Sequence, residues 1–259
     1  MVNRAIYTLF FISFLGLIIA ACAGQERRLE IVVHRGANKL APENTMAATQ
    51  KCIELGVEYV EIDVRESKDG VFYILHDKTL DRTTNGSGPI SEMHSNQIDK
   101  LDAGSWFSED FKGERVPRLE TYLNEFKGKI KIYFDIKRCD LKKLIDLVYK
   151  CGYQDDCFFW SSDDKKNKEL RQLDKKLALK MSVKKIKDLE YIMEYDPQLI
   201  ECRIDLLTPQ VIAFCKKNNL KIMLNALEKG AEKNYQQIID SHADMVKLNC
   251  QDIMVDLMK

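Results

Sequence analysis

The sequence has little of several features that would commit it to a specialised class. Only 12 glycines and 5 prolines occur among 259 residues, too few for long flexible linkers. No low-complexity tract or repeat of about 20 to 50 residues is present, which argues against a solenoid. There is no excess charge, because 40 Lys and Arg balance 40 Asp and Glu. A global basic field that would gather nucleic acid is therefore excluded, and any function must come from a local site.

What the sequence does contain is typical of a globular chain. The content is 45% hydrophobic and 31% charged. A chain of this length and composition builds one large domain or two small ones. Disorder and a polytopic membrane protein are excluded.

The amino terminus does not belong to the fold. A single Arg4 precedes an almost unbroken apolar run, Ala5–Ala21, which ends in small residues before Cys22 and so resembles a bacterial lipobox. We expect residues 1–21 to be a lipoprotein signal peptide, Cys22 to be lipidated, and residues 22–30 to be a linker. The protein would then be lipid-anchored to a bacterial cell membrane and face an extracytoplasmic space. A plain signal peptide or a retained membrane anchor is the alternative, because the run is almost long enough to span a bilayer.

The remaining cysteines do not indicate a metal site. Seven of the eight cysteines remain after Cys22, an odd number with no CxxC pair, which argues against zinc. Cys52 and Cys215 lie in helical patterns, where a cysteine behaves as a small apolar residue. We expect mostly buried free thiols. If the compartment is oxidising, Cys151 and Cys157 are the best candidates for a disulfide.

From residue 31 to the end, short β-branched or aromatic runs alternate with segments of helical period. The eight predicted strands cover residues 31–36, 59–65, 131–137, 157–162, 178–183, 199–204, 221–227 and 245–249. The helical patterns between them include residues 45–55, 119–126, 141–151, 186–195, 209–217, 232–241 and 251–258. Eight such repeats predict an α/β fold in which residues 31–259 form a closed (β/α)8 barrel, with an open doubly wound sheet as the alternative.

The alternation is interrupted after the second strand. Lys68–Gly70 is a hairpin turn signal, and Val71–Asp77 follows as another extended run. A two-residue turn would place His76 opposite Asp63. Residues 78–117 are too many for a barrel loop, and we expect them to form a small insertion over the barrel mouth.

Carboxylates share one face of two predicted strands. Glu61 and Asp63 are two residues apart on the second strand, and Asp135 and Lys137 have the same spacing on the third. Three acids without His or Cys match the oxygen ligands of one hard divalent cation, Mg²⁺ or Ca²⁺. The alternative is a salt-bridge network in which Lys137 and Arg35 neutralise the acids.

Several short motifs together resemble a known family. His34 stands at the carboxyl end of the first predicted strand, where barrel enzymes place catalytic groups. The sequence is similar to glycerophosphodiester phosphodiesterases, densely over residues 31–137 and weakly afterwards. The motifs, in order, are His34-Arg35-Gly36, Pro42-Glu43-Asn44-Thr45, Glu61-Ile62-Asp63-Val64, His76-Asp77, Arg82-Thr83-Thr84 with Gly86, Leu101 to Phe107, Val116 to Glu120, and Asp135-Ile136-Lys137.

The resemblance implies a TIM-barrel hydrolase that converts glycerophosphodiesters into glycerol 3-phosphate and an alcohol. It implies a two-step route, in which the glycerol 2-hydroxyl attacks phosphorus and water then opens the cyclic phosphate. The roles it implies are an acid and base pair, His34 and His76; metal ligands, Glu61, Asp63 and Asp135; and phosphate-binding residues, Arg35 and Lys137. Glu43 and Trp106 are further substrate-binding candidates, although Trp106 has the alternative of merely anchoring the insertion.

Two departures from the family pattern leave the substrate open. Asp135 stands where the family usually has Glu, and Met223–Ala226 stands where the family has Trp followed by Thr-Val-Asn. Glycerophosphoinositol or another phospholipid head group is therefore an alternative substrate. A non-catalytic lipoprotein that binds phosphodiesters is the alternative from another class. The histidine pair argues against it, because a binding protein needs no acid and base.

Overall fold

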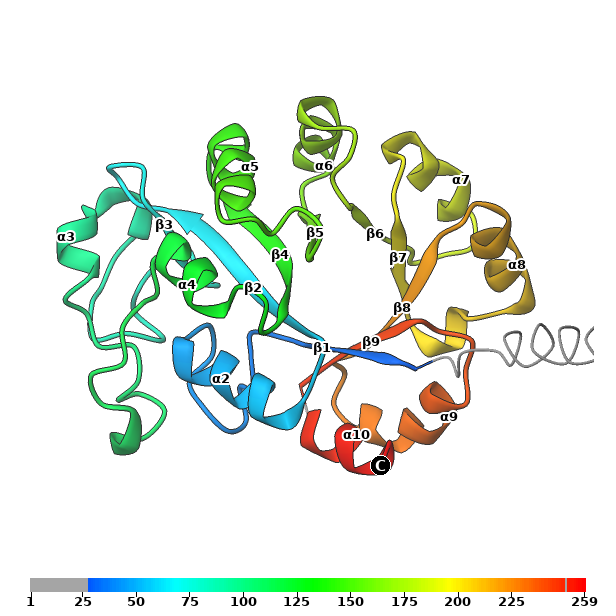
Figure 1. Ribbon diagram of the computed structural model, residues 1–259, viewed down its shortest axis with the longest axis horizontal. Helices are drawn as coiled ribbons and strands as arrows, with labels where there is room; N and C mark the ends of the chain where they lie inside the picture. Colours follow the sequence, from blue (N-terminus) through cyan, green and yellow to red (C-terminus); the bar gives the residue numbers. More distant parts are fainter. Residues whose placement is uncertain (1–27, 250) are drawn as a thin grey trace, which may run out of the picture.

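Eight parallel strands form a ring in the computed structural model, which describes residues 28–249 and 251–259 (Figure 1). The predicted signal peptide and Cys22 lie outside the described residues. The barrel strands are β1 (Glu30–Val33), β2 (Tyr59–Glu66), β4 (Lys131–Arg138), β5 (Cys157–Trp160), β6 (Lys180–Ser182), β7 (Leu199–Cys202), β8 (Lys221–Ala226) and β9 (Met245–Leu248). All eight predicted strands are therefore present.

The strand order shows a barrel and not an open doubly wound sheet. The order is β5-β4-β2-β1-β9-β8-β7-β6, so the first and last barrel strands are neighbours. Between β5 and β6 the ring is joined by one isolated parallel bridge, Phe159 to Leu179. The predicted (β/α)8 class is confirmed, with the ring nearly closed at this seam.

Helices follow the strands around the outside of the ring (Figure 1). They are α2 (Met46–Leu55), α4 (Leu119–Phe126), α5 (Leu141–Lys150), α6 (Asp164–Leu173), α7 (Asp188–Ile192), α8 (Pro209–Lys217), α9 (Tyr235–Ile239) and α10 (Gln251–Leu257). Side chains of Thr45, Asp140 and Thr208 accept hydrogen bonds from the first turns of α2, α5 and α8. Only α6 was not among the predicted ranges, because most of its residues are charged or polar and it buries just Asn167 and Leu170.

The barrel has two apolar layers, as the alternation of side chains along a strand requires. One set of side chains fills the lower interior: Val32, Tyr59, Tyr133, Phe158, Leu199, Met223 and Met245. A larger set lies between the sheet and the helices. These side chains fill the barrel interior below the mouth, and polar side chains gather at the carboxyl ends of the strands.

The hairpin after β2 has a register that differs by one residue from the prediction. Strand β3 (Phe72–Ile74) pairs antiparallel with β2, and Val64 lies opposite Ile74. The loop has three residues, not two, because the Ser67 amide donates to the Val71 carbonyl and Gly70 takes the left-handed φ of 83°. Leu75, not His76, is therefore opposite Asp63.

The segment between β3 and α4 forms a small subdomain at one side of the barrel. It contains η1 (Ile90–Glu92), α3 (Ser95–Ile98) and η2 (Glu109–Phe111). It has an apolar core of its own, made by Tyr73, Leu75, Leu80, Ile90, Ile98, Ala103 and Val116. The predicted insertion thus packs partly on itself, which explains how so long a segment is ordered without strands of the barrel.

The six described cysteines are free thiols: Cys52, Cys139, Cys151, Cys157, Cys202 and Cys215. The conditional pairing of Cys151 with Cys157 is therefore not observed. Four of these thiols, including Cys52 and Cys215, are buried, as the helical patterns predicted for those two. Within the described part of the chain, no helix has both the length and the apolar character needed to cross a bilayer.

Candidate active site

Three buried carboxylates meet at the barrel mouth. Glu61 and Asp63 extend from β2, and Asp135 extends from β4, where it lies directly beside Asp63 in the strand register. One oxygen of each residue lies within 4.8 Å of the others. The strand periodicity predicted this cluster, because residues two apart on neighbouring parallel strands share one face. These three acids could hold a metal ion.

The pKa values of the three acids are shifted in different directions. Burial, with Asp63 and Asp135 close by, raises the pKa of Glu61 well above its usual value. Burial also raises the pKa of Asp135, and Asp63 adds to this despite the neighbouring Lys137. The pKa of Asp63 is lowered, because Lys137, His76 and Asn44 together outweigh its burial. The charged forms of Glu61 and Asp135 are therefore disfavoured, and that of Asp63 is favoured.

The neighbouring cations of the chain neutralise the cluster only in part. Lys137 Nζ lies 2.9 Å from Asp63 Oδ1 and 2.8 Å from Asp135 Oδ2, while Arg35 Nε is 3.6 Å from Asp63. The predicted salt bridges therefore exist. Within the described residues, however, the buried Oδ1 of Asp135 receives no hydrogen bond. An unpaired buried oxygen in an all-carboxylate set fits a hard divalent cation as its missing partner.

A strained loop after β1 supports the carboxylates from one side. Arg35 and Asn44 both have a φ of 59°, a left-handed conformation that is uncommon outside glycine. In this conformation the Arg35 amide donates to Glu61 Oε2 at 2.7 Å, and Asn44 Nδ2 donates to Asp63 Oδ2 at 2.7 Å. Gly36 between them is required, because a Cβ there would lie 2.7 Å from that of Ala48. Asn44 was quoted in a motif but not assigned a role.

His34 lies beside Glu61 in a tautomer set by Asn249. Its Nδ1 donates to Asn249 Oδ1 at 3.0 Å, which leaves the Nε2 lone pair toward the site, 4.0 Å from Glu61 Oε2. Burial, followed by nearby Arg35 and Lys247, lowers the pKa of His34 to about 4. The imidazole is therefore neutral at pH 7 and able to accept a proton.

His76 also lies close to the carboxylates, although the predicted register was wrong. It follows the end of β3 by two residues, and its charge helps to lower the pKa of Asp63. Its Nδ1 donates to Asp77 Oδ1 at 2.7 Å, and Asp77 in turn accepts from Arg82 at 2.6 Å. Asp77 therefore holds Nδ1, and Nε2 is the ring nitrogen left to exchange a proton with a ligand.

Glu43 joins the two arginines on this side of the site. It accepts from Arg35 at 3.0 Å and from Arg82 at 2.8 and 2.9 Å. The carboxylate therefore orients Arg35 toward the acids and connects it with the residues that hold His76. Glu43 was predicted to bind substrate, and its contacts in the structure are with these cations.

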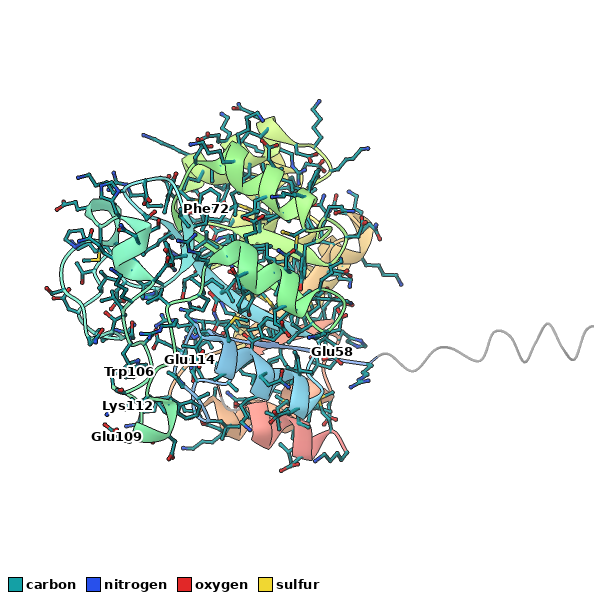
Figure 2. The ribbon with its side chains drawn as sticks, turned by 60° about the vertical axis from the view of Figure 1, so that its left-hand side comes forward. Glu58, Phe72, Trp106, Glu109, Lys112 and Glu114 are labelled. Atoms are coloured by element: carbon teal, nitrogen blue, oxygen red, sulfur yellow. The ribbon has the colours of Figure 1, made fainter. Side chains whose placement is uncertain are left out.

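Trp106 is placed on the outer part of the insertion, together with Glu109 and Lys112 (Figure 2). The residue is 41% exposed, and its ring packs edge-on against Phe107 and donates to the Ala103 carbonyl at 2.9 Å. These contacts lie within the insertion, as the anchoring alternative expects. Its role toward substrate stays a prediction.

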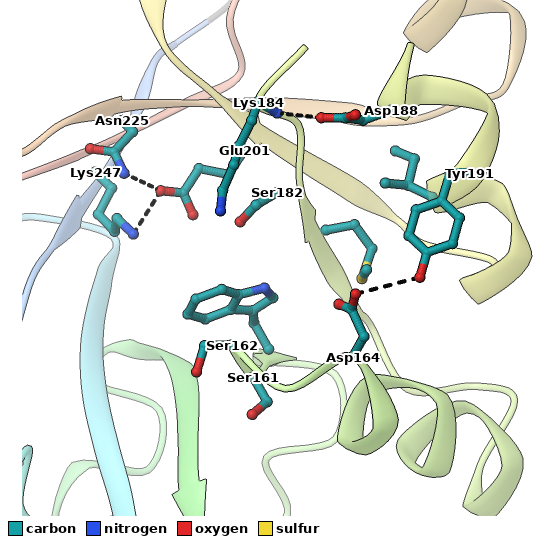
Figure 3. Close-up of a pocket in the computed structure, with 13 residues that line it drawn as sticks. Ser161, Ser162, Asp164, Ser182, Lys184, Asp188, Tyr191, Glu201, Asn225 and Lys247 are labelled. Atoms are coloured by element: carbon teal, nitrogen blue, oxygen red, sulfur yellow. Dashed lines mark hydrogen bonds and ion pairs between the residues drawn. The ribbon is translucent and has the colours of Figure 1, made fainter. Parts of the chain in front are cut away.

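A second polar cluster, which the sequence reading missed, lies across the mouth from the three acids. Lys180 on β6 and Lys247 on β9 both form ion pairs with Glu201 on β7. Asn225 on β8 donates to the same carboxylate, and Figure 3 shows Asn225 and Lys247 on Glu201. We call these four residues the lysine cluster. Lys180 and Lys247 hold the pKa of Glu201 well below its usual value despite burial. Burial lowers the pKa of Lys180 to about 8, so it is still mostly charged at pH 7.

The signal for the lysine cluster was present in the sequence. Lys180, Glu201 and Lys247 are single charged residues in otherwise apolar strands, and each is less than a tenth exposed. Charged residues at such positions are paired or functional. What no pattern revealed is that three separate strands bring them together.

The fold is a (β/α)8 barrel, and two histidines lie close to three buried carboxylates at its mouth. These features define the class of protein. The chain matches the glycerophosphoryl diester phosphodiesterase family over residues 34–198. It belongs to this family, as the motifs indicated.

Individual relatives match different shares of this chain. A glycerophosphodiester phosphodiesterase from Caldanaerobacter subterraneus is 26% identical over 88% of this chain and 97% of its own length. One from Bacillus subtilis is 36% identical over 44% of this chain, which is 41% of that protein. This chain therefore matches less than half the length of some curated relatives.

Solved structures share the fold. The glycerophosphodiester phosphodiesterase of Agrobacterium tumefaciens superimposes with a TM-score of 0.83 at 37% identity, covering 88% of this chain and 100% of that one. An Oleispira antarctica phosphodiesterase, solved with its product sn-glycerol 3-phosphate, gives 0.79 at 23% identity, covering 89% and 97%. At that lower identity the second likeness concerns the fold alone.

Replacing Glu201 by Gln should destabilise the protein. Two buried ammonium groups lose their anion, and we expect the free energy of unfolding at pH 7 to fall by about 3 kcal/mol. Because the folded pKa of Glu201 is depressed, its contribution is present above the unfolded pKa and is lost as the pH falls. The difference from wild type should therefore shrink below about pH 4. Urea unfolding measures both effects.

The matched control is Glu190→Gln, at an exposed position of α7. This change should alter stability by less than about 0.5 kcal/mol. Equal stability of the two variants at pH 7 would contradict the role given to Glu201.

Proposed function

We propose that this chain hydrolyses glycerophosphodiesters to glycerol 3-phosphate and an alcohol. The observation that carries the proposal is the gathering of two histidines with fixed tautomers around a buried carboxylate cluster. Membership of the phosphodiesterase family supports it, as does the near-complete coverage of the Caldanaerobacter and Agrobacterium proteins. The product expected here is the one bound by the Oleispira phosphodiesterase of the same fold.

The histidines divide the proton transfers between them. His34 is neutral at pH 7, because its pKa is about 4, and it accepts the proton of the attacking hydroxyl. His76 donates a proton from Nε2 to the leaving alkoxide, while Asp77 on Nδ1 stabilises the charged ring. The geometry gives each imidazole one anchored nitrogen and one free nitrogen, which is what acid and base catalysis requires.

Arg35 and Lys137 bind the phosphate oxygens. Both cations already reach Asp63 from neighbouring positions at the mouth. Charge on the phosphoryl oxygens develops as the new bond forms, and fixed cations stabilise it without reorganisation. Glu43 positions Arg35 for this purpose through its 3.0 Å contact.

One divalent cation, Mg²⁺ or Ca²⁺, is held by Glu61, Asp63 and Asp135. The unpaired Oδ1 of Asp135 and the raised pKa of Glu61 support this assignment. When bound, the cation supplies positive charge for the phosphodiester oxygens. Asp135 is one methylene shorter than the glutamate usual in the family, so its carboxylate would contact the cation directly only if the cation lay nearer to β4, or would contact it through a water.

Hydrolysis should depend on the cation. We expect activity to stop on chelation and to return with Mg²⁺ or Ca²⁺ but not with monovalent salt, because all three candidate ligands are hard carboxylates. Asp135→Asn should raise the metal concentration for half-maximal rate at least tenfold. Asp146→Asn, on the exposed face of α5, is the control and should leave that concentration unchanged. Full activity after exhaustive chelation would show that Arg35 and Lys137 suffice.

Loss of either histidine should reduce turnover. We expect kcat to fall roughly 10²- to 10⁴-fold in His34→Ala and in His76→Ala, the usual contribution of one acid or base. The double variant should lose much less than the product of the two single losses, because both residues serve one reaction. Steady-state kinetics on glycerophosphodiesters measures these effects, with His242→Ala, exposed before β9, as the control.

The same kinetics separate an enzyme from a binding lipoprotein. If the wild type, supplied with metal, binds a glycerophosphodiester and hydrolyses none, the catalytic proposal is wrong. Normal turnover by His76→Ala would also contradict it.

We further propose that Cys22 carries a lipid that holds the protein on an extracytoplasmic bacterial membrane, as the lipobox-like run implies. In a bacterial host, wild type should incorporate labelled fatty acid and sediment with membranes. Cys22→Ser should take up no label and should keep residues 1–21. A mature protein without label, or a labelled one that retains those residues, would favour the plain signal peptide or the retained anchor.

A further inference from the structure

His76 lies where the pairing of the hairpin ends. Strand β3 pairs with β2 as far as Ile74, and the Leu75 amide then donates to the Asp63 carbonyl at 2.9 Å. His76 is the next residue, and from there the chain enters the insertion beside the barrel (Figure 1). The hairpin therefore fixes the residue before His76, and the position of His76 itself depends on further contacts.

Arg65 on β2 makes such a contact with the main chain of His76. Its Nε donates to the His76 carbonyl at 3.0 Å, and its Nη2 donates to the same oxygen at 2.7 Å. The donors of a guanidinium lie in one rigid plane, so two bonds to one oxygen fix a direction as well as a distance. The half-buried Arg65 therefore holds the His76 carbonyl against the end of β2.

The imidazole of His76 is held by different residues. Its Nδ1 contacts Asp77, which also accepts from Arg82. Asp77 is the residue directly after His76, so this pair can move together with the loop. Arg65, by contrast, is two residues from Asp63 on a barrel strand. Its contact therefore relates the position of His76 directly to that of the acids.

A β-bulge at the rim of the barrel accompanies Arg65. Val64 pairs with Ile136, whereas Arg65 pairs with Arg138, so Lys137 is an extra residue of β4. Bulges are frequent next to active sites, where they redirect side chains. Arg65 thus has a neighbour of its own residue type across the bulge, and that neighbour, Arg138, is exposed.

The charge of Arg65 lies near acids of the site. Burial lowers the pKa of Arg65, and attraction to Asp63, Asp77 and Asp135 opposes this effect. A cation in this place has two possible roles, to bind the phosphate or to hold His76. Two of the three guanidinium nitrogens are directed to the His76 carbonyl, which favours the second role.

We propose that Arg65 is a positioning residue, which holds the main chain of His76 so that the imidazole reaches the leaving alkoxide. This inference rests on the proposed role of His76 as the acid. Without the two hydrogen bonds the loop is free to shift relative to β2. A displacement of about 1 Å in a catalytic group is enough to reduce the rate about 10²-fold.

The first experiment is a double-mutant cycle with His76. We expect kcat to fall about 10- to 100-fold in Arg65→Met and in Arg65→Gln, with KM little changed, because the phosphate-binding groups stay in place. Since Arg65 acts through His76, Arg65→Met should not slow His76→Ala any further. Arg138→Met removes the same charge from the neighbouring strand position and should leave kcat unchanged.

Three results of these kinetics would overturn the inference. One is a wild-type kcat in a folded Arg65→Met or Arg65→Gln variant. Another is an equal further loss of rate when Arg65→Met is added to His76→Ala. The third is a raised KM with unchanged kcat, which would indicate that Arg65 binds the substrate directly.

A second measurement needs no turnover. The chain has four histidines, His34, His76, His94 and His242, so labelling histidine with ¹⁵N gives few side-chain NMR signals. The signal that is missing in His76→Ala belongs to His76. Arg65→Gln should shift or broaden this signal and leave those of His94 and His242 unchanged.

The NMR result separates this inference from the proposed hydrolysis. An unchanged His76 signal in Arg65→Gln would overturn the inference, even if the wild type hydrolyses glycerophosphodiesters. A change in the His76 signal, with the signals of His94 and His242 unchanged, would support it, even if the wild type hydrolyses nothing.

Discussion

Three carboxylates buried within a few ångströms of one another are the constraint around which this barrel mouth is organised. Each acid loses its hydration, and each repels the other two. The pKa of Glu61 is raised, whereas that of Asp63 is lowered. The protein therefore stabilises the charged form of Asp63 more than that of Glu61. The neighbouring groups compensate the negative charge. Lys137 pairs with Asp63 and Asp135. A strained loop lets the Arg35 amide donate to Glu61 and the Asn44 side chain donate to Asp63.

The histidines take their chemical states from this arrangement. Burial beside the cluster and beside cations keeps His34 neutral, which a base requires. His76 is connected with Arg35 by a chain of hydrogen bonds through Asp77, Arg82 and Glu43. A chain of hydrogen-bonded charged residues therefore connects the surroundings of the two imidazoles.

The barrel mouth is divided into two halves of different chemistry. Strands β2 and β4 carry the acids, and β6 to β9 carry the lysine cluster, where Glu201 pairs with Lys180 and Lys247. Lys247 connects the two, because its charge is felt by both Glu201 and Glu61. Such a division suits a diester, because its phosphate and its organic group need different binding groups.

The sequence by itself determined the barrel and its acidic centre. Alternating strands and helices specify eight repeats, and the two-residue spacing of Glu61 and Asp63 places both on one face, since successive side chains of a strand point to opposite sides. Strong local signals such as Thr45, Asp140 and Thr208 also fixed where helices begin.

Only the tertiary structure decided the rest, because it depends on contacts between distant segments. The hairpin register was set by the left-handed Gly70 in a three-residue loop, which a turn motif alone does not distinguish from a two-residue one. The lysine cluster joins Lys180, Glu201 and Lys247 from three strands separated by whole helices. A local pattern indicates the face of the strand on which a side chain lies. Which residue that side chain contacts depends on how the barrel closes, which brings β9 next to β1.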